Sequence, residues 1–269
     1  MSENVLSGFK ACCVDLYGNP AVTWLMGDSF HPGGSAVTER LGRLASLKPS
    51  DLVLDVACGT GSSATLLAKQ FGCRVVGADL AGSLVFRARA AAGRKKLDRL
   101  LDFALGDAEA LPFQDASFDA VFSECAVSTF PDKDAAASEM ARVLKPGGRL
   151  GFTDVVLDRK EVAGDPLGWF FQVACISDAC STGRYREIFA SAGFSGWQEQ
   201  LHPEALTLLL NQVRARLLTL EVAKGLQKVD LTGFDLTPAR QILRRVEDWI
   251  KSGGVTYGIF LAVKEAPHE

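Results

Sequence analysis

Residues 54–63 read LDVACGTGSS, and this stretch decides the fold. A short apolar run ends in a loop with glycines at 59 and 61, and a helical pattern begins directly after the loop. Glycine lets the backbone approach a ligand closely, and the free N–H groups at a helix start favour negative charge. The stretch lacks the GxGxxG spacing of dinucleotide-binding loops and the GK[ST] ending of phosphate loops. It therefore predicts a strand–loop–helix unit that faces another kind of ligand.

The same alternation of short strands and helices continues along the chain. Apolar runs closed by turns predict strands, and apolar residues at helical spacing predict helices between them. Such alternation at short intervals is the signature of a doubly wound, mostly parallel α/β sheet. The expected strands are 51–57, 73–79, 101–107, 118–124 and 149–157, and the expected helices are 61–71, 83–96 and 135–144.

The flanking regions do not follow this alternation. The first 50 residues predict helices around the loop GDSFHPGG, with Ser35 as the N-cap of a helix over 36–47. Towards the other end, helical patterns over 205–225 and 238–251 precede a last strand over 255–265. We expect four parts: an N-terminal helical cover (1–50), an α/β domain (51–202), a helical cap (203–252), and a final strand with a tail (253–269).

Composition limits the possible partners. The chain has 269 residues, 48% of them hydrophobic, and a net charge of −3, which suits one large domain or a domain with a cap. No basic tract is long enough to bind nucleic acid, and no uninterrupted apolar run is long enough to cross a membrane. The N-terminal residues lack a signal-peptide pattern, so we expect a cytoplasmic protein, monomeric or homodimeric.

Two acidic residues end strands next to the glycine loop. Asp79 follows Gly61 by 18 residues and can accept hydrogen bonds from ribose hydroxyls, and Asp107 ends the next expected strand. Ligands of open α/β sheets bind at the carboxyl ends of strands, where these loops meet. Either acid alone could simply cap the following helix, but the ordered set favours a binding crevice.

These segments resemble the class I S-adenosylmethionine-dependent methyltransferases. The matching pieces are LDVACGTG, GADLA, GDAEALPF, SFDAVFSE and ARVLKPGG, over residues 45–160. The resemblance implies a Rossmann-like seven-stranded sheet whose last strand is antiparallel, with S-adenosyl-L-methionine as the cofactor. It implies that Asp55 and the backbone of 58–61 face the methionine part, Asp79 the ribose, and Asp107 with Ala108 the adenine. The full expected cofactor set is Asp55, Cys58, Gly59, Thr60, Gly61, Asp79, Leu80, Asp107, Ala108 and Glu124.

The chain has seven cysteines, whose thiolates could hold a thiophilic element as the group that receives the methyl. None forms a CxxC pair, and most isolated cysteines are small buried hydrophobes. Cys125 differs because it follows the fourth expected strand, beside the expected methyl donor. Cys175 and the pair Cys12–Cys13 lie in segments that could meet it above the cofactor, and a set of thiolates is a soft cage for a thiophilic element.

This second pattern resembles the arsenite methyltransferases. It rests on FKACC, SECAVSTFPDK, FTDV and VACISDA, with Glu124 where that family has asparagine. The resemblance implies that the thiolates of Cys125, Cys175 and Cys13 (or Cys12) bind trivalent arsenic as a metalloid substrate, and that an external thiol reductant restores the cysteines. Such a reaction would need no general base.

Two other functions remain open from the sequence. A small organic acceptor, such as a quinone, sterol or natural product, predicts an apolar pocket that includes Trp169, Phe170 and Phe171. Oxygen and nitrogen acceptors also need a base, for which His31 is a candidate, whereas His202 looks like a strand-end residue. The last possibility is a non-catalytic sensor of S-adenosylmethionine or of a metalloid.

Overall fold

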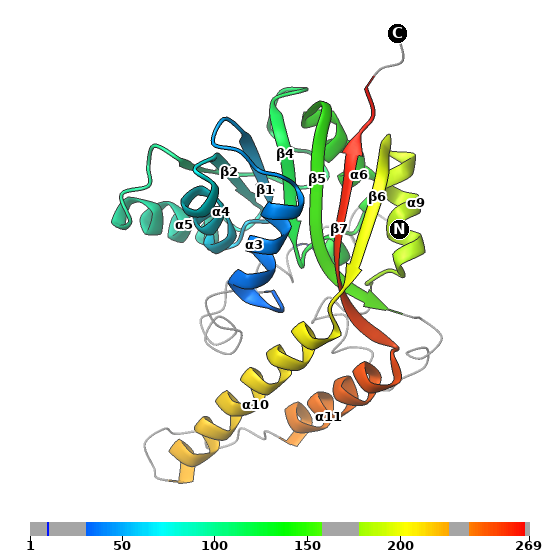
Figure 1. The fold of residues 1–269 in the computed structure, drawn as a ribbon. Helices are drawn as coiled ribbons and strands as arrows, with labels where there is room; N and C mark the ends of the chain where they lie inside the picture. Colours follow the sequence, from blue (N-terminus) through cyan, green and yellow to red (C-terminus); the bar gives the residue numbers. More distant parts are fainter. Residues whose placement is uncertain (1–9, 11–30, 158–177, 226–236, 267–269) are drawn as a thin grey trace.

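A computed structural model describes residues 10, 31–157, 178–225 and 237–266. Its centre is a seven-stranded sheet in the order β3-β2-β1-β4-β5-β7-β6 (Figure 1). Neighbouring strands from β3 to β5 are parallel, whereas β7 runs antiparallel to both β5 and β6. The doubly wound, mostly parallel fold with an antiparallel last strand is confirmed. The strands are β1 Leu52–Val56, β2 Arg74–Asp79, β3 Leu101–Leu105, β4 Phe118–Glu124, β5 Leu144–Leu157, β6 Phe194–Leu201 and β7 Val255–Lys264.

Helices cover both faces of the sheet, so each face has its own apolar core. Side chains of α3, α4 and α5 pack in one cluster, and those of α6 and α9 pack in a second cluster on the opposite face (Figure 1). Burial of these apolar surfaces is the main force that holds the layers together. The helices are α3 Gly34–Leu44, α4 Ser62–Phe71, α5 Gly82–Arg94, α6 Lys133–Val143 and α9 Thr182–Ser191, with a short 3₁₀ turn, η1 Val127–Thr129.

Two further helices extend from the end of the sheet at which the parallel strands terminate. Helix α10, Pro203–Gly225, follows β6, and α11, Thr237–Ser252, precedes β7; the two run side by side (Figure 1). Leu210 of α10 and Trp249 of α11 belong to the same apolar cluster as α3 and α4. The two predicted helical patterns are therefore present, while their separation as a cap domain stays a prediction. None of the helices in the described ranges is both long and apolar enough to cross a bilayer.

Local predictions were wrong at two places. Ser35 is not an N-cap: α3 already begins at Gly34, after Gly33 in a left-handed conformation with φ 78°. The fifth strand begins at Leu144 rather than at Arg149, because Leu144 pairs with Phe118 before the register shifts. The predicted KPGG turn is thus an irregular stretch within β5.

Candidate functional site

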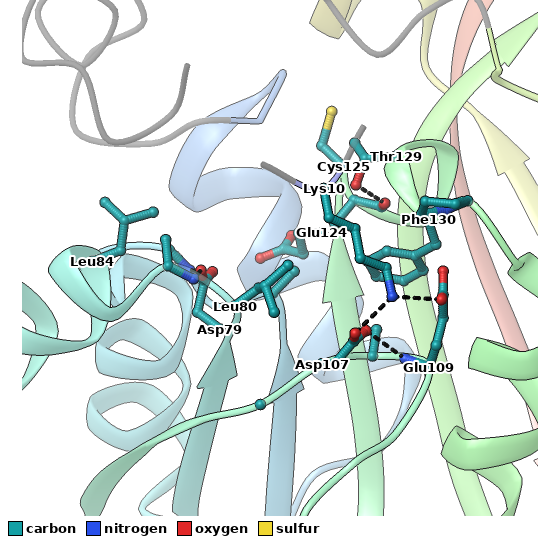
Figure 2. A pocket seen from close by; sticks show the side chains of 17 residues that line it. Lys10, Asp79, Leu80, Leu84, Asp107, Glu109, Glu124, Cys125, Thr129 and Phe130 are labelled. Atoms are coloured by element: carbon teal, nitrogen blue, oxygen red, sulfur yellow. Dashed lines mark hydrogen bonds and ion pairs between the residues drawn. The ribbon is translucent and has the colours of Figure 1, made fainter. Parts of the chain in front are cut away.

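The loops after β1, β2, β3 and β4 meet where the strand order reverses, between β1 and β4. This reversal is where open α/β sheets bind ligands, because neighbouring loops diverge there and leave a crevice. A pocket occupies the place, and Figure 2 shows its lining. The pocket is lined by Lys10, Ala57, Gly59, Asp79, Leu80, Ala81, Leu84, Gly106, Asp107, Ala108, Glu109, Glu124, Cys125, Ala126, Thr129, Phe130 and Pro131.

The glycine loop contributes backbone to this pocket. Gly59 lines it, with φ 54°. Gly61 precedes α4 with φ 73°, and a Cβ there would lie 2.6 Å from the ring of Phe103, so both conformation and space require glycine. Cys58 is 7% exposed and packs in the core. Of the residues predicted here, Cys58, Thr60 and Gly61 are not among those that line the pocket, so their cofactor contacts stay predictions.

Asp79 joins two of the loops. Its Oδ2 accepts a hydrogen bond from the backbone N–H of Gly59 and its Oδ1 accepts one from Ala81, each at 2.8 Å. Burial raises the pKa of the Asp79 carboxyl, and these two backbone donors act in the opposite direction. Asp79 and its neighbour Leu80 both line the pocket. The residue therefore braces the loops and faces the pocket at once.

At one end of the pocket, which we call the Asp107 end, charges are paired within the chain. The ammonium of Lys10 lies 2.6 Å from Asp107 Oδ2 and 2.6 Å from Glu109 Oε2 (Figure 2). Burial acts to lower the pKa of Lys10, but the two carboxylates outweigh it and raise the pKa. Ala108 lies between the two acids and also lines the pocket. Lys10 was not predicted; its only sequence signal was its place in FKACC, which drew attention to the cysteines.

A second region, which we call the Glu124 end, holds two buried carboxylates; Glu124 lines the pocket, whereas Asp55 is not among the lining residues, so its predicted cofactor contact stays a prediction. Asp55 at β1 is 2% exposed and the Glu124 side chain at β4 is 4% exposed. Asp55 Oδ2 and Glu124 Oε1 have no hydrogen-bond partner among the described residues. Burial raises the pKa of Asp55 well above its ordinary value, and the charges of Glu124 and Asp79 add to this effect. A cationic group that donates hydrogen bonds would satisfy both oxygens and offset both charges.

His31 lies behind Glu124 rather than in the pocket. The ring is 6% exposed, and its Nε2 is 3.5 Å from Glu124 Oε2. It is not one of the residues that line the pocket. This position does not favour a base that touches an acceptor. His202 directly follows β6 and donates its backbone N–H to Tyr257, as expected of a strand-end residue.

Cys125 lines the pocket, but its surroundings favour a protonated thiol. Burial raises its pKa well above the ordinary value, the negative charge of Asp154 acts in the same direction, and a hydrogen bond with Tyr257 opposes them. Its backbone has φ 54°, unusual for a residue with a side chain. Cys12, Cys13 and Cys175 lie outside the described residues, and the described residues hold no group of three metal ligands. The predicted arsenic-binding set therefore stays a prediction.

The fold and the position of the site define a class of protein. Residues 54–152 match the family model of a methyltransferase domain. They contain β1, β2, β3, β4 and the first part of β5, which carry the pocket. This segment is thus similar to a methyltransferase domain, in line with the resemblance to class I S-adenosylmethionine-dependent methyltransferases that the sequence predicted.

Curated relatives match over the same region. Methyltransferase GfsG of Streptomyces halstedii is 37% identical over 130 residues, covering 48% of this chain and 47% of that protein. O-methyltransferase resE of Aspergillus sclerotiorum is 30% identical, covering 59% and 60%. The 2-methyl-6-phytyl-1,4-hydroquinone methyltransferase of Synechocystis is 43% identical over 113 residues, covering 42% and 35%. The match with GfsG thus spans about half the length of each protein.

Solved structures share the fold over nearly the whole chain. Phosphoethanolamine N-methyltransferase 2 of Haemonchus contortus, in complex with S-adenosylhomocysteine, has a TM-score of 0.81 at 22% identity, covering 96% of this chain and 60% of that one. Geranyl diphosphate C-methyltransferase of Streptomyces coelicolor has 0.73 at 17%, covering 95% and 98%. The [4+2]-cyclase SpnF has 0.69 at 22%, covering 97% and 96%. Because SpnF is a cyclase, the fold alone does not fix the reaction.

Proposed function

We propose that this protein is an S-adenosylmethionine-dependent methyltransferase that acts on a small organic acceptor. The observation that carries the proposal is the pocket at the β1–β4 reversal, whose lining residues, apart from Lys10, all lie in the segment that matches a methyltransferase domain. The relatives support an organic acceptor, since their names describe O-methyltransferases and a hydroquinone methyltransferase.

The residues of the pocket fit the cofactor. Asp107 and Ala108 would hold the adenine and Asp79 the ribose, since all three line the pocket. The free carboxylate oxygens of Asp55 and Glu124 suit the cationic methionine part. When bound, the cofactor supplies an electrophilic methyl group on a sulfonium.

The acceptor would enter beside the loop after β4. Cys125, Ala126 and Phe130 line that side of the pocket. Their surfaces are largely apolar, which favours an apolar or aromatic acceptor over a highly charged one. The role of this chain is then to hold the acceptor in line with the methyl group and to exclude water. The aromatic residues predicted for the acceptor pocket, 169–171, lie outside the described residues, and their role stays a prediction.

A radiolabelled methyl donor tests the proposal. The protein is incubated with methyl-labelled S-adenosylmethionine and, separately, a substituted hydroquinone, a phenolic polyketide, geranyl diphosphate, or arsenite with a thiol reductant. We expect label in an organic product, and loss of that label in an Asp79→Ala variant. Binding of S-adenosylhomocysteine is measured in parallel by calorimetry. No detectable binding would contradict the cofactor assignment, and binding without transfer to any acceptor would favour the non-catalytic sensor.

Arsenite remains a second candidate because of one observation, the position of Cys125 in the pocket. The reaction would need thiolates at Cys125, Cys175 and Cys13, whereas the surroundings of Cys125 raise its pKa. The variants Cys125→Ser and Cys175→Ser separate the two functions. The metalloid function would be supported if the wild type methylates arsenite and either serine variant loses that activity while it still binds the cofactor. Organic methylation that survives both changes would support our proposal.

A further inference from the structure

Glu124 is held from behind by residues of the N-terminal part of the chain. Its Oε2 accepts a hydrogen bond of 2.8 Å from the hydroxyl of Thr38, a residue of α3 that is 1% exposed. Its Oε1 has no partner among the described residues, although Glu124 lines the pocket. The carboxylate is thus fixed through one oxygen, while the other has no partner among the described residues. Figure 2 shows Glu124 among the residues that line the pocket.

His31 extends this support. The hydroxyl proton of Thr38 is directed at Glu124, so Thr38 can only accept from a further donor. His31 Nε2 lies 3.3 Å from the Thr38 hydroxyl, to which an Nε2–H would donate, and His31 Nδ1 lies 3.3 Å from the carbonyl oxygen of Pro32, which can only accept. The same nitrogen is 3.5 Å from Glu124 Oε2 and 3.5 Å from the hydroxyl of Ser63, at the start of α4. The imidazole joins α3, α4 and the end of β4 in one buried polar cluster.

The negative charge near this cluster indicates which kind of ligand group would bind there. The closest acidic group on β1, Asp55, also carries an oxygen without a partner in the described part of the chain. The Asp55 carboxylate receives a backbone donor from Ala64 and repels the charge of Glu124. Two buried carboxylates with free oxygens are stabilised by a cation that donates hydrogen bonds, which describes a primary ammonium group.

We propose that Thr38 and His31 are positioning residues that hold Glu124 so that its free oxygen receives the α-ammonium group of the methyl donor. The inference rests on the proposed function, because it takes the cofactor as given. In this arrangement the Thr38 hydroxyl and the His31 imidazole set the affinity of the protein for the amino-acid part of the cofactor. Glu124 is one of the residues at which the chain departs from the arsenite methyltransferase pattern, and this role gives that departure a physical reason.

Two ligands isolate the ammonium contact. S-adenosylhomocysteine carries the α-amino group, and its deaminated analogue has hydrogen in that place; both affinities are measured by calorimetry. In the wild type we expect the first ligand to bind at least about tenfold more tightly, since a hydrogen bond to a charged group is worth roughly 1.5–3 kcal/mol. Glu124→Gln should reduce this preference to about threefold or less, with the affinity for the deaminated analogue unchanged.

The positioning residues are tested with matched pairs. Thr38→Val removes the hydroxyl with nearly the same shape, and Thr38→Ser keeps it. His31→Leu removes the donor, and His31→Gln keeps an N–H in a similar place. We expect Val and Leu to reduce the preference for the amino ligand about fivefold, as loss of a buried hydrogen bond predicts. Ser and Gln should retain most of the preference.

The outcomes separate the inference from the proposed function. If the wild type binds neither ligand, the cofactor assignment fails and the inference falls with it. If the wild type binds both but Thr38→Val and His31→Leu leave the preference unchanged, the inference alone is wrong. Equal weakening of both ligands would mean general damage to the fold rather than positioning and would also overturn it. A drop in kcat with unchanged binding would place Glu124 at the acceptor instead.

Discussion

The two ends of the pocket handle negative charge in opposite ways. At the Asp107 end, Lys10 lies 2.6 Å from each of two acids, and all three side chains are partly exposed, at 14–30%. At the Glu124 end, Asp55 and Glu124 are almost fully buried, and each has one oxygen without a hydrogen-bond partner in the described part of the chain. The chain neutralises the first end with its own residue and leaves the second for a ligand. Cofactor affinity should therefore depend strongly on the second end and weakly on ion pairing at the first.

The largest effect is expected from Asp79→Ala, because Asp79 lines the pocket and ties the glycine loop to the loop after β2. The change removes its bonds to Gly59 and Ala81. Bonds to a buried charge are worth roughly 1.5–3 kcal/mol each, so the affinity for S-adenosylhomocysteine should fall by about a hundredfold or more. Calorimetry measures the affinity, and Asp115→Ala, at a side chain that is 77% exposed, is the control. Unchanged affinity would remove Asp79 from the site.

Gly61→Ala should destabilise the fold by about 3 kcal/mol, because left-handed backbone and steric overlap add together. The overlap is with Phe103, 2.6 Å from the added Cβ. Gly147→Ala is a matched control, since Gly147 has φ 72° but nothing within 4 Å of the added atom, and should cost only about 1 kcal/mol. Denaturant unfolding measures both variants. Equal losses would mean that the glycine loop is not sterically constrained.

Asp55→Asn, at the Glu124 end, should increase the stability of the free protein and decrease its affinity for the cofactor. We expect the free protein to gain about 1 kcal/mol at neutral pH, because an amide carries no titration cost at this buried position and can donate to Glu124. The affinity for S-adenosylhomocysteine should fall about tenfold as an attractive charge is lost. Thermal unfolding and calorimetry measure the two changes. A variant that loses both stability and binding would show that Asp55 is already satisfied in the free protein.

The same residue predicts a pH dependence. The pKa of Asp55 is raised in the folded state, so the folded protein holds a proton that the unfolded chain releases above about pH 4. Stability from this group is complete below that pH and declines as the pH rises towards the folded-state pKa. A bound ammonium favours the carboxylate, so the affinity for S-adenosylhomocysteine should rise with pH over the same window. Both slopes should flatten in Asp55→Asn.

The smallest effect is expected from Lys10→Met at the Asp107 end. A partly exposed ion pair contributes little, so affinity for S-adenosylhomocysteine should change by less than about fivefold. The difference between wild type and variant should shrink further in 1 M salt, because salt screens exposed charges. Lys10→Arg keeps the charge and serves as the control. A change as large as that of Asp79→Ala would mean that Lys10 is part of the binding machinery.

The site residues that could be predicted are those whose position follows from the local sequence pattern. Gly59, Asp79 and Asp107 were found from sequence alone because each follows a strand at a fixed spacing. Lys10 reaches the same pocket from the N-terminal part, and Thr38 and His31 contact Glu124 from outside the pocket lining. These contacts span 97 residues between Lys10 and Asp107 and 86 between Thr38 and Glu124. No local periodicity records such contacts. The cysteine hypothesis placed Cys125 at the pocket but could not anticipate the acidic groups that surround its thiol.

The position of β7 has a consequence for the order in which the chain can fold. It is the last strand along the chain, yet it lies between β5 and β6. During synthesis, one edge of β5 has no partner strand, and β6 has none at either edge, until residues 255–264 have emerged. Unpaired strand edges can associate with other chains. Pairings between segments this distant are also slow to form. Completion of the sheet, and with it the seating of α10 and α11, should therefore be a late step that benefits from chaperones.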